Sequence, residues 1–470
     1  MEIAEIRSLA VLGLRRSGRP AALLARRRLP AATVTGLDED TSLSGEIITE
    51  LEAAGVALSL GAAAQLPAGV DLLVKSPGVP DTSPIVLAAL ARGITVWSEV
   101  EFATRFLENR LIGITGTNGK TTTTELTGAI LRDADFPVAV GGNVGYALAE
   151  MPDTIPPQAT IVAELSSFQL EHIERFRPDV AVLLNLTEDH LDRHGSYRAY
   201  VDAKLRIVAN QHGGDLVLLN ADDPNTLAEV PALRALGGGR HAWFSARPGH
   251  AAHNLVAGVD NDGELWLDHD EQRVPLCSAA ALALKGRHNL ENSLAAAAAT
   301  AAAGVPAASI AETLRSFKGV PHRLQVVGVV GGVTYVNDSK ATNIDATCKA
   351  LTAYAGPVHL ILGGFDKGAD YRDLAVATEG VVKEVLLVGA TAAALAEAFA
   401  TRQAVSAGAT PCVVCGDLEN AVRTAARAAL PGDVVLLSPA CASWDQYRDY
   451  VARGEHFITL VDDLRDTENV

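Results

Sequence analysis

The stretch Gly113–Thr124, GITGTNGKTTTT, follows an apolar strand-like run and precedes a sequence suited to a helix. It nearly fits G-x-x-x-x-G-K-[ST], the pattern of loops that place backbone N–H groups and a lysine around phosphates. The pattern misses by one residue, because five places before Gly119 stands Ile114 rather than Gly113 or Gly116. Since the start of a helix attracts anions, we interpret the stretch as a phosphate-binding loop between a strand and a helix.

Two side chains of this loop have the chemistry of a nucleotide site. Lys120 can reach the outer phosphates as a point charge, and the Thr121 hydroxyl can be a ligand of Mg²⁺. A chance glycine-rich turn is the alternative interpretation. The full set of loop residues expected at the nucleotide is Gly116, Thr117, Asn118, Gly119, Lys120, Thr121 and Thr122.

Outward from the loop, short apolar runs alternate with helical stretches, which is typical of β-α units on a parallel sheet. Runs such as LAVLGL and ATVTGL come first, TIVAELSS, VAVLLNL and DLVLLN follow the loop, and VTYVNDSK, HLILGG, EVLLVG, CVVCG and VVLLSP fill the last third. The stretch around GHAAHNLVAGVDNDGELWL is expected to be a hairpin or loop, and a long helix is expected to begin near GRHNLENS.

We therefore predict an α/β fold with three domains. Residues 1–100 form a Rossmann-like domain, 101–319 a central domain with a P-loop ATPase-like parallel sheet, and 320–470 a second Rossmann-like domain. Ser98 and Glu101 form the sequence pattern of a capping box, and the helix that they open is expected to cross the first boundary.

The composition limits the class of partner. A net charge of −17 over 470 residues argues against binding of nucleic acid, which needs a basic face. Five cysteines are too few and too scattered for a disulfide framework, and the single CxxC at Cys412 and Cys415 favours packed thiols over zinc or redox chemistry. No segment resembles a signal peptide or offers about 20 apolar residues for a membrane span. We expect a cytoplasmic monomer that does not bind membranes.

The short form TGTNGKT resembles the loop of the ATP-dependent Mur ligases and of their relatives, the folylpolyglutamate synthases. These enzymes form amide bonds by way of an acyl phosphate. The resemblance extends through most of the chain and is strongest in the second and third predicted domains. It implies ATP as cofactor, two Mg²⁺ ions, and cations placed where a carboxylate meets the γ-phosphate.

The resemblance implies a set of metal ligands. Glu164 ends the strand-like run in TIVAELSS, and His190 lies in NLTEDHLDRH after another run. Lys204, in the helix-like YRAYVDAKLRIVAN, matches a family lysine that CO₂ converts to a carbamate, an anionic oxygen ligand suited to Mg²⁺; a plain surface lysine is the alternative. The implied metal set is Thr121, Glu164, His190 and Lys204, and the implied catalytic set is Lys120, Glu164, His190 and Lys204.

Other matching positions imply the nucleotide contacts. Arg323 in PHRLQ resembles a phosphate-contacting arginine, Asp338 in VNDSKATN a ribose-binding acid, and Asn289 and Asn292 in GRHNLENS residues near the adenine.

The segments NDSKATN, GGFDKGAD and SPACASWDQY resemble those of family members that add D-glutamate to UDP-N-acetylmuramoyl-L-alanine. A lysine with hydroxyl groups is a suitable receptor for two carboxylates. The lack of a DNPR segment speaks against the members that add lysine or diaminopimelate. The implied D-glutamate site consists of Thr342, Lys367 and Ser443, with Trp444 and Tyr450 alongside.

The UDP-sugar is expected in the first domain. The turn GLRRSG resembles the dinucleotide fingerprint, but Arg15 replaces its middle glycine, and Gly36 stands roughly where an acid would meet the uridine. An ordinary β-α turn is the alternative interpretation. The implied contacts are Arg15, Ser17, Asp38, Ser76, Gly78 and Asn143, with Ser166 beside the muramoyl group.

Three other functions remain open at this point. A folylpolyglutamate synthase shares the loop, a nicotinamide-dependent dehydrogenase would use GLRRSG, and a non-enzymatic nucleotide sensor would use only the loop. The SPACAS segment disfavours the folylpolyglutamate synthase. The imperfect GLRRSG fingerprint disfavours the dehydrogenase, and the polar residues at strand ends disfavour the sensor.

Overall fold

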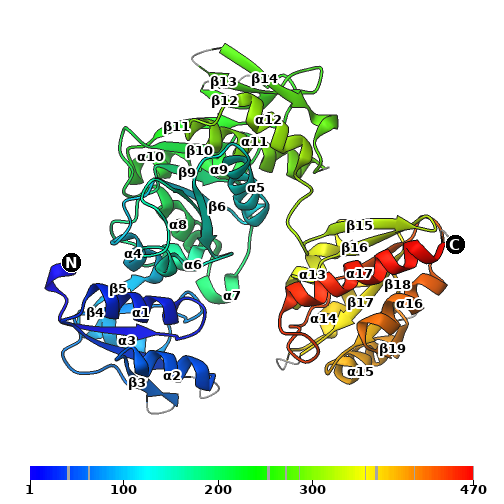
Figure 1. Ribbon diagram of the computed structural model, residues 1–470, viewed down its shortest axis with the longest axis horizontal. Coiled ribbons are helices and arrows are strands. Elements are labelled where there is room, and N and C mark those ends of the chain that lie inside the picture. The colour runs from blue at the N-terminus through cyan, green and yellow to red at the C-terminus, as the bar shows by residue number, and fades with distance from the viewer. Residues whose placement is uncertain are drawn as a thin grey trace. The chain divides into compact units, whose positions relative to one another are not determined.

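The chain forms two compact units, Met1–Phe317 and Lys318–Val470, each seen in Figure 1. The computed structural model describes residues 1–39, 43–61, 64–250, 254–269, 272–284, 286–354, 356–365, 369–406 and 408–468. Three sheets are present, two in the first unit and one in the second. The α/β class with three parallel-dominated sheets is confirmed; the domain boundary near residue 100 stays a prediction.

The first sheet has the order β3-β2-β1-β4-β5, and all its neighbouring strands run parallel. The order reverses at β1, so the loops after β1 and β4 border the crevice where such sheets bind ligands. Its elements are β1 Ser8–Leu12, α1 Gly18–Arg28, β2 Thr33–Asp38, α2 Gly45–Ala53, β3 Ala57–Leu60, β4 Leu72–Lys75, α3 Pro84–Ala91, β5 Thr95–Ser98 and α4 Glu99–Thr104.

The second sheet has the order β14-β13-β12-β11-β10-β9-β6-β8-β7. Strand β6 lies between β8 and β9 and is buried along its whole length, as its uninterrupted apolar sequence requires. Its strands are β6 Leu111–Thr115, β7 Val138–Gly142, β8 Thr160–Glu164, β9 Val180–Leu183, β10 Leu216–Asn220, β11 Arg240–Phe244, β12 Leu255–Val259, β13 Glu264–His269 and β14 Gln272–Ser278. β13 pairs antiparallel with both β12 and β14, which confirms the predicted hairpin.

Helices cover both faces of this sheet (Figure 1). On one face α5 and the alanine-rich α11 pack on Ile112 and Ile114, and on the other α8 packs on Ile161 and Leu183. The helices are α5 Lys120–Asp133, α6 Ser167–Leu170, α7 Leu191–His194, α8 Tyr197–Leu205, α9 Pro224–Ala228, α10 Val230–Leu236, α11 Arg287–Ala302 and α12 Ala307–Ser316. The helix predicted near GRHNLENS is confirmed as α11.

The second unit is built on the sheet β15-β16-β20-β17-β18-β19. Only β15 runs antiparallel to its neighbour, and the sequence patterns did not predict this edge strand. Its elements are β15 Gln325–Val330, β16 Val333–Asn337, α13 Ile344–Leu351, β17 Val358–Gly363, α14 Arg372–Ala377, β18 Val382–Val388, α15 Ala392–Gln403, β19 Cys412–Gly416, α16 Leu418–Ala428, β20 Val434–Leu437 and α17 Tyr450–Glu468.

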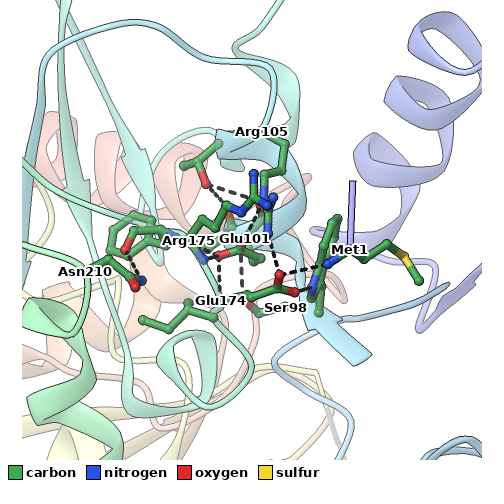
Figure 2. A network of polar contacts seen from close by, with 12 residues as sticks. Met1, Ser98, Glu101, Arg105, Glu174, Arg175 and Asn210 are labelled. Atoms are coloured by element: carbon green, nitrogen blue, oxygen red, sulfur yellow. Dashed lines mark hydrogen bonds and ion pairs between the residues drawn. The ribbon is translucent and has the colours of Figure 1, made fainter. Parts of the chain in front are cut away.

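Helix α4 joins the first sheet to the second through a partly buried polar network (Figure 2). Ser98 caps α4 by accepting a hydrogen bond from the Glu101 N–H at 3.2 Å. The reciprocal half of the predicted capping box is wrong, because the fully buried Glu101 carboxylate instead accepts the N–H groups of residues 174–176 at 2.8–2.9 Å and pairs with Arg105. Glu101 therefore links α4 by hydrogen bonds to residues 174–176, which follow α6.

Among the residues that the structure describes, no helix is both long enough and apolar enough to cross a membrane.

Candidate functional site

The loop between β6 and α5 has the backbone of a phosphate cradle. Gly119 is the N-cap of α5 with a φ of +83°, and no side chain caps this helix in the described part of the chain. A Cβ at Gly119 would overlap the amide oxygen of Asn292, so both the conformation and the close approach require glycine. The start of α5 therefore presents backbone N–H groups and the positive end of the helix dipole.

The loop is tied to the segment that follows β9. The Thr117 hydroxyl lies 2.8 Å from the Tyr200 hydroxyl and accepts the N–H of Thr187 at 3.0 Å. The N–H of Asn118 donates to the side chain of Asn185 at 2.8 Å. These contacts fix the shape of the cradle.

The other predicted nucleotide residues of the first unit gather at the start of α5. Thr121 is buried in its first turn, and Thr122 is partly exposed beside it. The buried Asn292 of α11 accepts a hydrogen bond from Thr123 at 3.3 Å and donates to Asn289 at 3.3 Å. Helix α11 therefore brings both asparagines close to the cradle, and their place near the adenine stays a prediction.

Two lysines converge on one carbonyl of the cradle. Lys120 Nζ donates to the oxygens of Gly116 and Thr117 at 3.0 and 2.8 Å. Lys204 Nζ donates to the same Gly116 oxygen at 2.8 Å and lies 4.7 Å from the ring centre of Tyr200.

Lys204 is buried, with 2 % of its surface exposed, so the alternative of a surface lysine is wrong. Burial lowers the pKa of Lys204 well below its ordinary value, and the charge of Lys120 lowers it further, while Asp189 and Glu164 act in the opposite direction. The site thus favours a neutral amine at this position.

Glu164 lies at the end of β8 and is 1 % exposed. Its Oε1 accepts a hydrogen bond from Asn143 at 2.7 Å, but its Oε2 is buried without a hydrogen-bond partner among the described residues. A buried carboxylate oxygen without a donor is costly, so this atom fits a cation. His190 is the N-cap of α7, with a half-exposed side chain and its Nε2 3.7 Å from Asp189.

A pocket of about 390 Å³ in the first unit collects most of the residues predicted for the UDP-sugar. Six of them line it: Arg15, Ser17, Asp38, Ser76, Gly78 and Asn143. Ser166 is not among the lining residues; it caps α6 by accepting the N–H of Gln169 at 3.3 Å, and Gln169 lines the pocket.

The glycines and the acid near the fingerprint turn can be placed beside this pocket. Gly18 packs so closely on the Gly13 carbonyl that a Cβ would overlap it. It stands at the position of the third glycine of the fingerprint, which allows the helix to pack closely on the strand. Gly36 lies inside β2, where a Cβ would meet Leu14 and Leu58, and it does not line the pocket; its place relative to the uridine stays a prediction. The acid at the end of that strand is Asp38, whose carboxylate accepts the Leu14 N–H at 2.8 Å.

Six further residues line the pocket outside the predicted set: Gly13, Arg16, Pro77, Val79, Gly142 and Gln169. Gly13 and Arg16 belong to the turn GLRRSG, which the sequence had already singled out. The pattern Ser166-x-x-Gln169 is itself a capping box and could have identified Gln169 as an ordered side chain.

In the second unit, Asp338 follows β16 and is buried. It accepts hydrogen bonds from Ser438 at 2.7 Å and from the Leu324 N–H at 3.1 Å. Burial raises the pKa of Asp338 to about 6, although the nearby charge of Arg323 lowers it in part. Arg323 is exposed and close enough to act on this carboxylate.

The three segments predicted for D-glutamate lie at the carboxyl ends of the neighbouring strands β16, β20 and β17. The Phe365 N–H donates to the Ala442 oxygen at 2.8 Å, and the rings of Phe365 and Trp444 are 5.8 Å apart. Ser443 is buried and Trp444 is exposed. Thr342 and Tyr450 are partly exposed at the same end of the sheet, and Lys367 lies outside the described residues.

Comparisons with known proteins agree with this arrangement. The model of the Mur ligase middle domain matches residues 114–300, and that of the Mur ligase glutamate ligase domain matches residues 322–441. A UDP-N-acetylmuramoylalanine–D-glutamate ligase from Acidobacterium capsulatum is 44 % identical over 97 % of this chain and 96 % of its own length. The ligase of the same name from Solibacter usitatus is 43 % identical over 99 % of both chains.

Solved structures share the fold at low identity. The UDP-N-acetylmuramate-alanine ligase MurC from Thermotoga maritima has a TM-score of 0.51 and 19 % identity, covering 98 % of this chain and all of that one. MurF from the same organism, solved with ADP, has a TM-score of 0.53 and 17 % identity, covering 93 % of this chain and 95 % of that one. With its phosphate cradle, its strand-end polar groups and these full-length matches, the chain belongs to the Mur ligase family, alongside the UDP-N-acetylmuramoylalanine–D-glutamate ligases.

Proposed function

We propose that this chain adds D-glutamate to UDP-N-acetylmuramoyl-L-alanine in peptidoglycan precursor synthesis, with hydrolysis of ATP to ADP and phosphate. The observation that carries the proposal is that Asn143 contacts both the nucleotide-sugar pocket and the group of residues at the phosphate cradle. This side chain lines the nucleotide-sugar pocket and also donates to Glu164 beside the phosphate cradle. A UDP-sugar in that pocket would extend its acyl end toward the cradle.

The reaction needs a carboxylate and a γ-phosphate to meet, and both are anions. The terminal carboxylate of the L-alanine takes the γ-phosphoryl group, and the amine of D-glutamate then displaces phosphate from the acyl phosphate to form the amide. Lys120 and the N–H groups at the start of α5 balance the negative charge during the first step. The contribution of the protein is mainly placement and charge neutralisation.

Mg²⁺, when bound, would supply positive charge that offsets the charges of the phosphates and the carboxylate. The residues that would hold it are Thr121, Glu164, His190 and Lys204, of which Glu164 offers the buried oxygen without a donor. Lys204 takes this role as a carbamate. Its burial lowers its pKa and favours the neutral amine, which attacks CO₂ and releases a proton as the carbamate forms.

In the second unit, Asp338 and Arg323 would contact the ribose and the phosphates of ATP. Thr342, Lys367 and Ser443 would bind the carboxylates of D-glutamate, with Trp444 and Tyr450 alongside. The strand-end placement of the described members supports this assignment. We further propose that the protein acts as a monomer in the cytoplasm, where ATP is supplied.

The test is an ADP-release assay with purified protein, ATP, Mg²⁺ and UDP-N-acetylmuramoyl-L-alanine. We expect turnover with D-glutamate and almost none with L-glutamate, L-lysine or meso-diaminopimelate. Turnover that prefers one of these other amino acids would assign the chain to another amide ligase. Release of ADP without any amino acid would contradict ligase activity.

A further inference from the structure

The loop Ser76–Val79, which lines the nucleotide-sugar pocket, is held from outside the pocket by Arg193 of α7. The two terminal nitrogens of Arg193 donate to the carbonyl oxygens of Gly78 at 3.3 Å and Val79 at 2.7 Å. Gly78 is exposed, and nothing lies within 4 Å of the place where its Cβ would be. The Val79 N–H closes the turn on the Ser76 oxygen at 3.0 Å, and the Val79 side chain packs against the core of the first sheet. Arg193 adds the side-chain hydrogen bonds to the carbonyls of Gly78 and Val79.

The base of the loop is fixed separately. Lys75, fully buried at the end of β4, forms ion pairs with Asp81 and, at 3.2 Å, with Glu171. His172 contacts the same Asp81 carboxylate at 2.9 Å. Asp81, Glu171 and His172 are grouped closely enough to be metal ligands, but the Lys75 ammonium already supplies their positive charge. This cluster holds the residues on either side of the loop, whereas Arg193 holds the carbonyl oxygens of Gly78 and Val79.

Arg193 also touches the aromatic group beside the cradle. Its guanidinium carbon lies 4.0 Å from the ring centre of Phe168. His194 stacks on the same ring at 5.1 Å, and His190 lies against it at 5.0 Å. One side chain thus contacts the wall of the sugar pocket and the ring that supports His190, a proposed metal ligand.

These contacts continue to the phosphate cradle. His194 lies 2.9 Å from the Ser167 hydroxyl and meets the ring of Tyr200 edge-on at 5.5 Å. Tyr200 in turn lies 2.8 Å from the Thr117 hydroxyl. A packed path therefore joins the sugar pocket to the cradle through Arg193, Phe168, His194 and Tyr200.

We propose that Arg193 is a positioning residue that keeps the loop Ser76–Val79 in the form that binds the UDP-sugar and aligns this loop with His190. The inference rests on the proposed function. A dissociation constant rises by the inverse of the fraction of protein in the binding-competent form, so loss of Arg193 weakens sugar binding without any loss of direct contact. ATP binding, which depends on the cradle, stays intact.

The experiment measures binding by calorimetry on the full chain. We expect Arg193→Ala to raise the Kd of UDP-N-acetylmuramoyl-L-alanine by about tenfold or more, as loss of charge-assisted hydrogen bonds predicts. The Kd of a non-hydrolysable ATP analogue should change less than about twofold. Arg193→Lys, which keeps the charge but cannot bridge two carbonyls in the same way, should lie between the alanine variant and the wild type.

Arg110 is the matched control, because its terminal nitrogens also donate to two successive carbonyls, those of Ala302 and Ala303. Arg110→Ala should leave both dissociation constants unchanged. If Arg193→Ala folds poorly in a thermal melt, the dissociation constants of the UDP-sugar and of the ATP analogue are compared in Arg193→Lys instead.

Two results would overturn the inference alone: wild-type affinity for the UDP-sugar in Arg193→Ala, or equal weakening of the UDP-sugar and the ATP analogue. If the wild type binds no UDP-sugar, the proposed function falls and the inference falls with it.

Discussion

At the scale of single residues, Lys204 shows how strongly burial and a neighbouring charge can lower the pKa of a lysine. In sequence it is a lysine near the end of a helix, yet it is buried against Tyr200 and the Gly116 carbonyl. An ammonium there loses its hydration and faces a second lysine, Lys120, which also reaches Gly116. Both effects lower the pKa of Lys204 and so favour the neutral amine, the form that reacts with CO₂, whereas an exposed lysine at neutral pH is almost fully protonated.

We predict that wild-type enzyme depleted of bicarbonate loses most of its activity and regains it when bicarbonate returns. Lys204→Ala should be nearly inactive in both conditions, while it binds an ATP analogue normally. A ¹³C-bicarbonate NMR experiment should detect a carbamate signal in the wild type and in Lys318→Ala, which removes an exposed lysine. A fully active Lys204→Ala, or a wild type without the signal, would contradict the carbamate.

Glu99 is another buried carboxyl, at the start of α4. Its Oε1 accepts the Ala149 N–H, but its Oε2 is buried without a hydrogen-bond partner among the described residues. Burial raises the pKa of Glu99 from 4.5 to about 7. The folded protein therefore binds more protons than the unfolded chain between these values, so Glu99 makes stability fall as the pH rises from about 4.5 to 7.

We predict that Glu99→Gln reduces the loss of stability between pH 5 and pH 8. The raised pKa corresponds to a penalty of up to about 3 kcal/mol at pH 8, which the neutral amide does not incur. Urea unfolding followed by tryptophan fluorescence at both pH values measures the difference. Glu52→Gln, at an exposed position, should keep the wild-type dependence. If the dependence of stability on pH is unchanged in Glu99→Gln, this carboxyl is already ionised in the folded protein at pH 5.

At the scale of elements, the cradle depends on how α5 begins and on what packs against it. Gly119 adopts a left-handed conformation, and α11 brings Asn292 so close that no side chain fits. The strand β6, the turn and α5 are local and could be predicted. The approach of α11 comes from a helix more than 160 residues later in the chain, so no local pattern specifies it.

We predict that Gly119→Ala both destabilises the protein and weakens ATP binding at least tenfold. Gly263→Ala is the matched control, because Gly263 has the same φ of +83° but open space around its Cβ position. Each variant should lose about 1–2 kcal/mol from the left-handed conformation. Only Gly119→Ala should also displace Asn292 and disturb the cradle. Thermal melts and calorimetry with an ATP analogue would test this, and equal ATP affinity in the two variants would refute it.

At the scale of the whole molecule, each compact unit has its own hydrophobic core. The clusters around Leu360 and Val435 lie entirely in the second unit, and those around Ile161, Ile114 and Leu73 lie in the first. A core that is complete within one unit is the condition for independent folding.

We therefore predict that residues 318–470 fold on their own. A fragment with these residues should show a cooperative thermal transition by circular dichroism, with the α/β spectrum of its sheet and helices. A fragment truncated after residue 430 lacks β20 and α17, which pack in this core, and should not fold. A non-cooperative melt of the longer fragment would mean that the second unit needs the first.

The sequence by itself determined the succession of strands and helices, the phosphate cradle and the polar segments at strand ends. These features depend on hydrophobic periodicity and on glycine and cap positions, which act between near neighbours. Only the tertiary structure decided that Lys204 is buried, that one Glu164 oxygen has no donor among the described residues, and that Arg193 holds the loop Ser76–Val79. Burial, pKa and pocket shape depend on residues distant in sequence, and only folding brings these together.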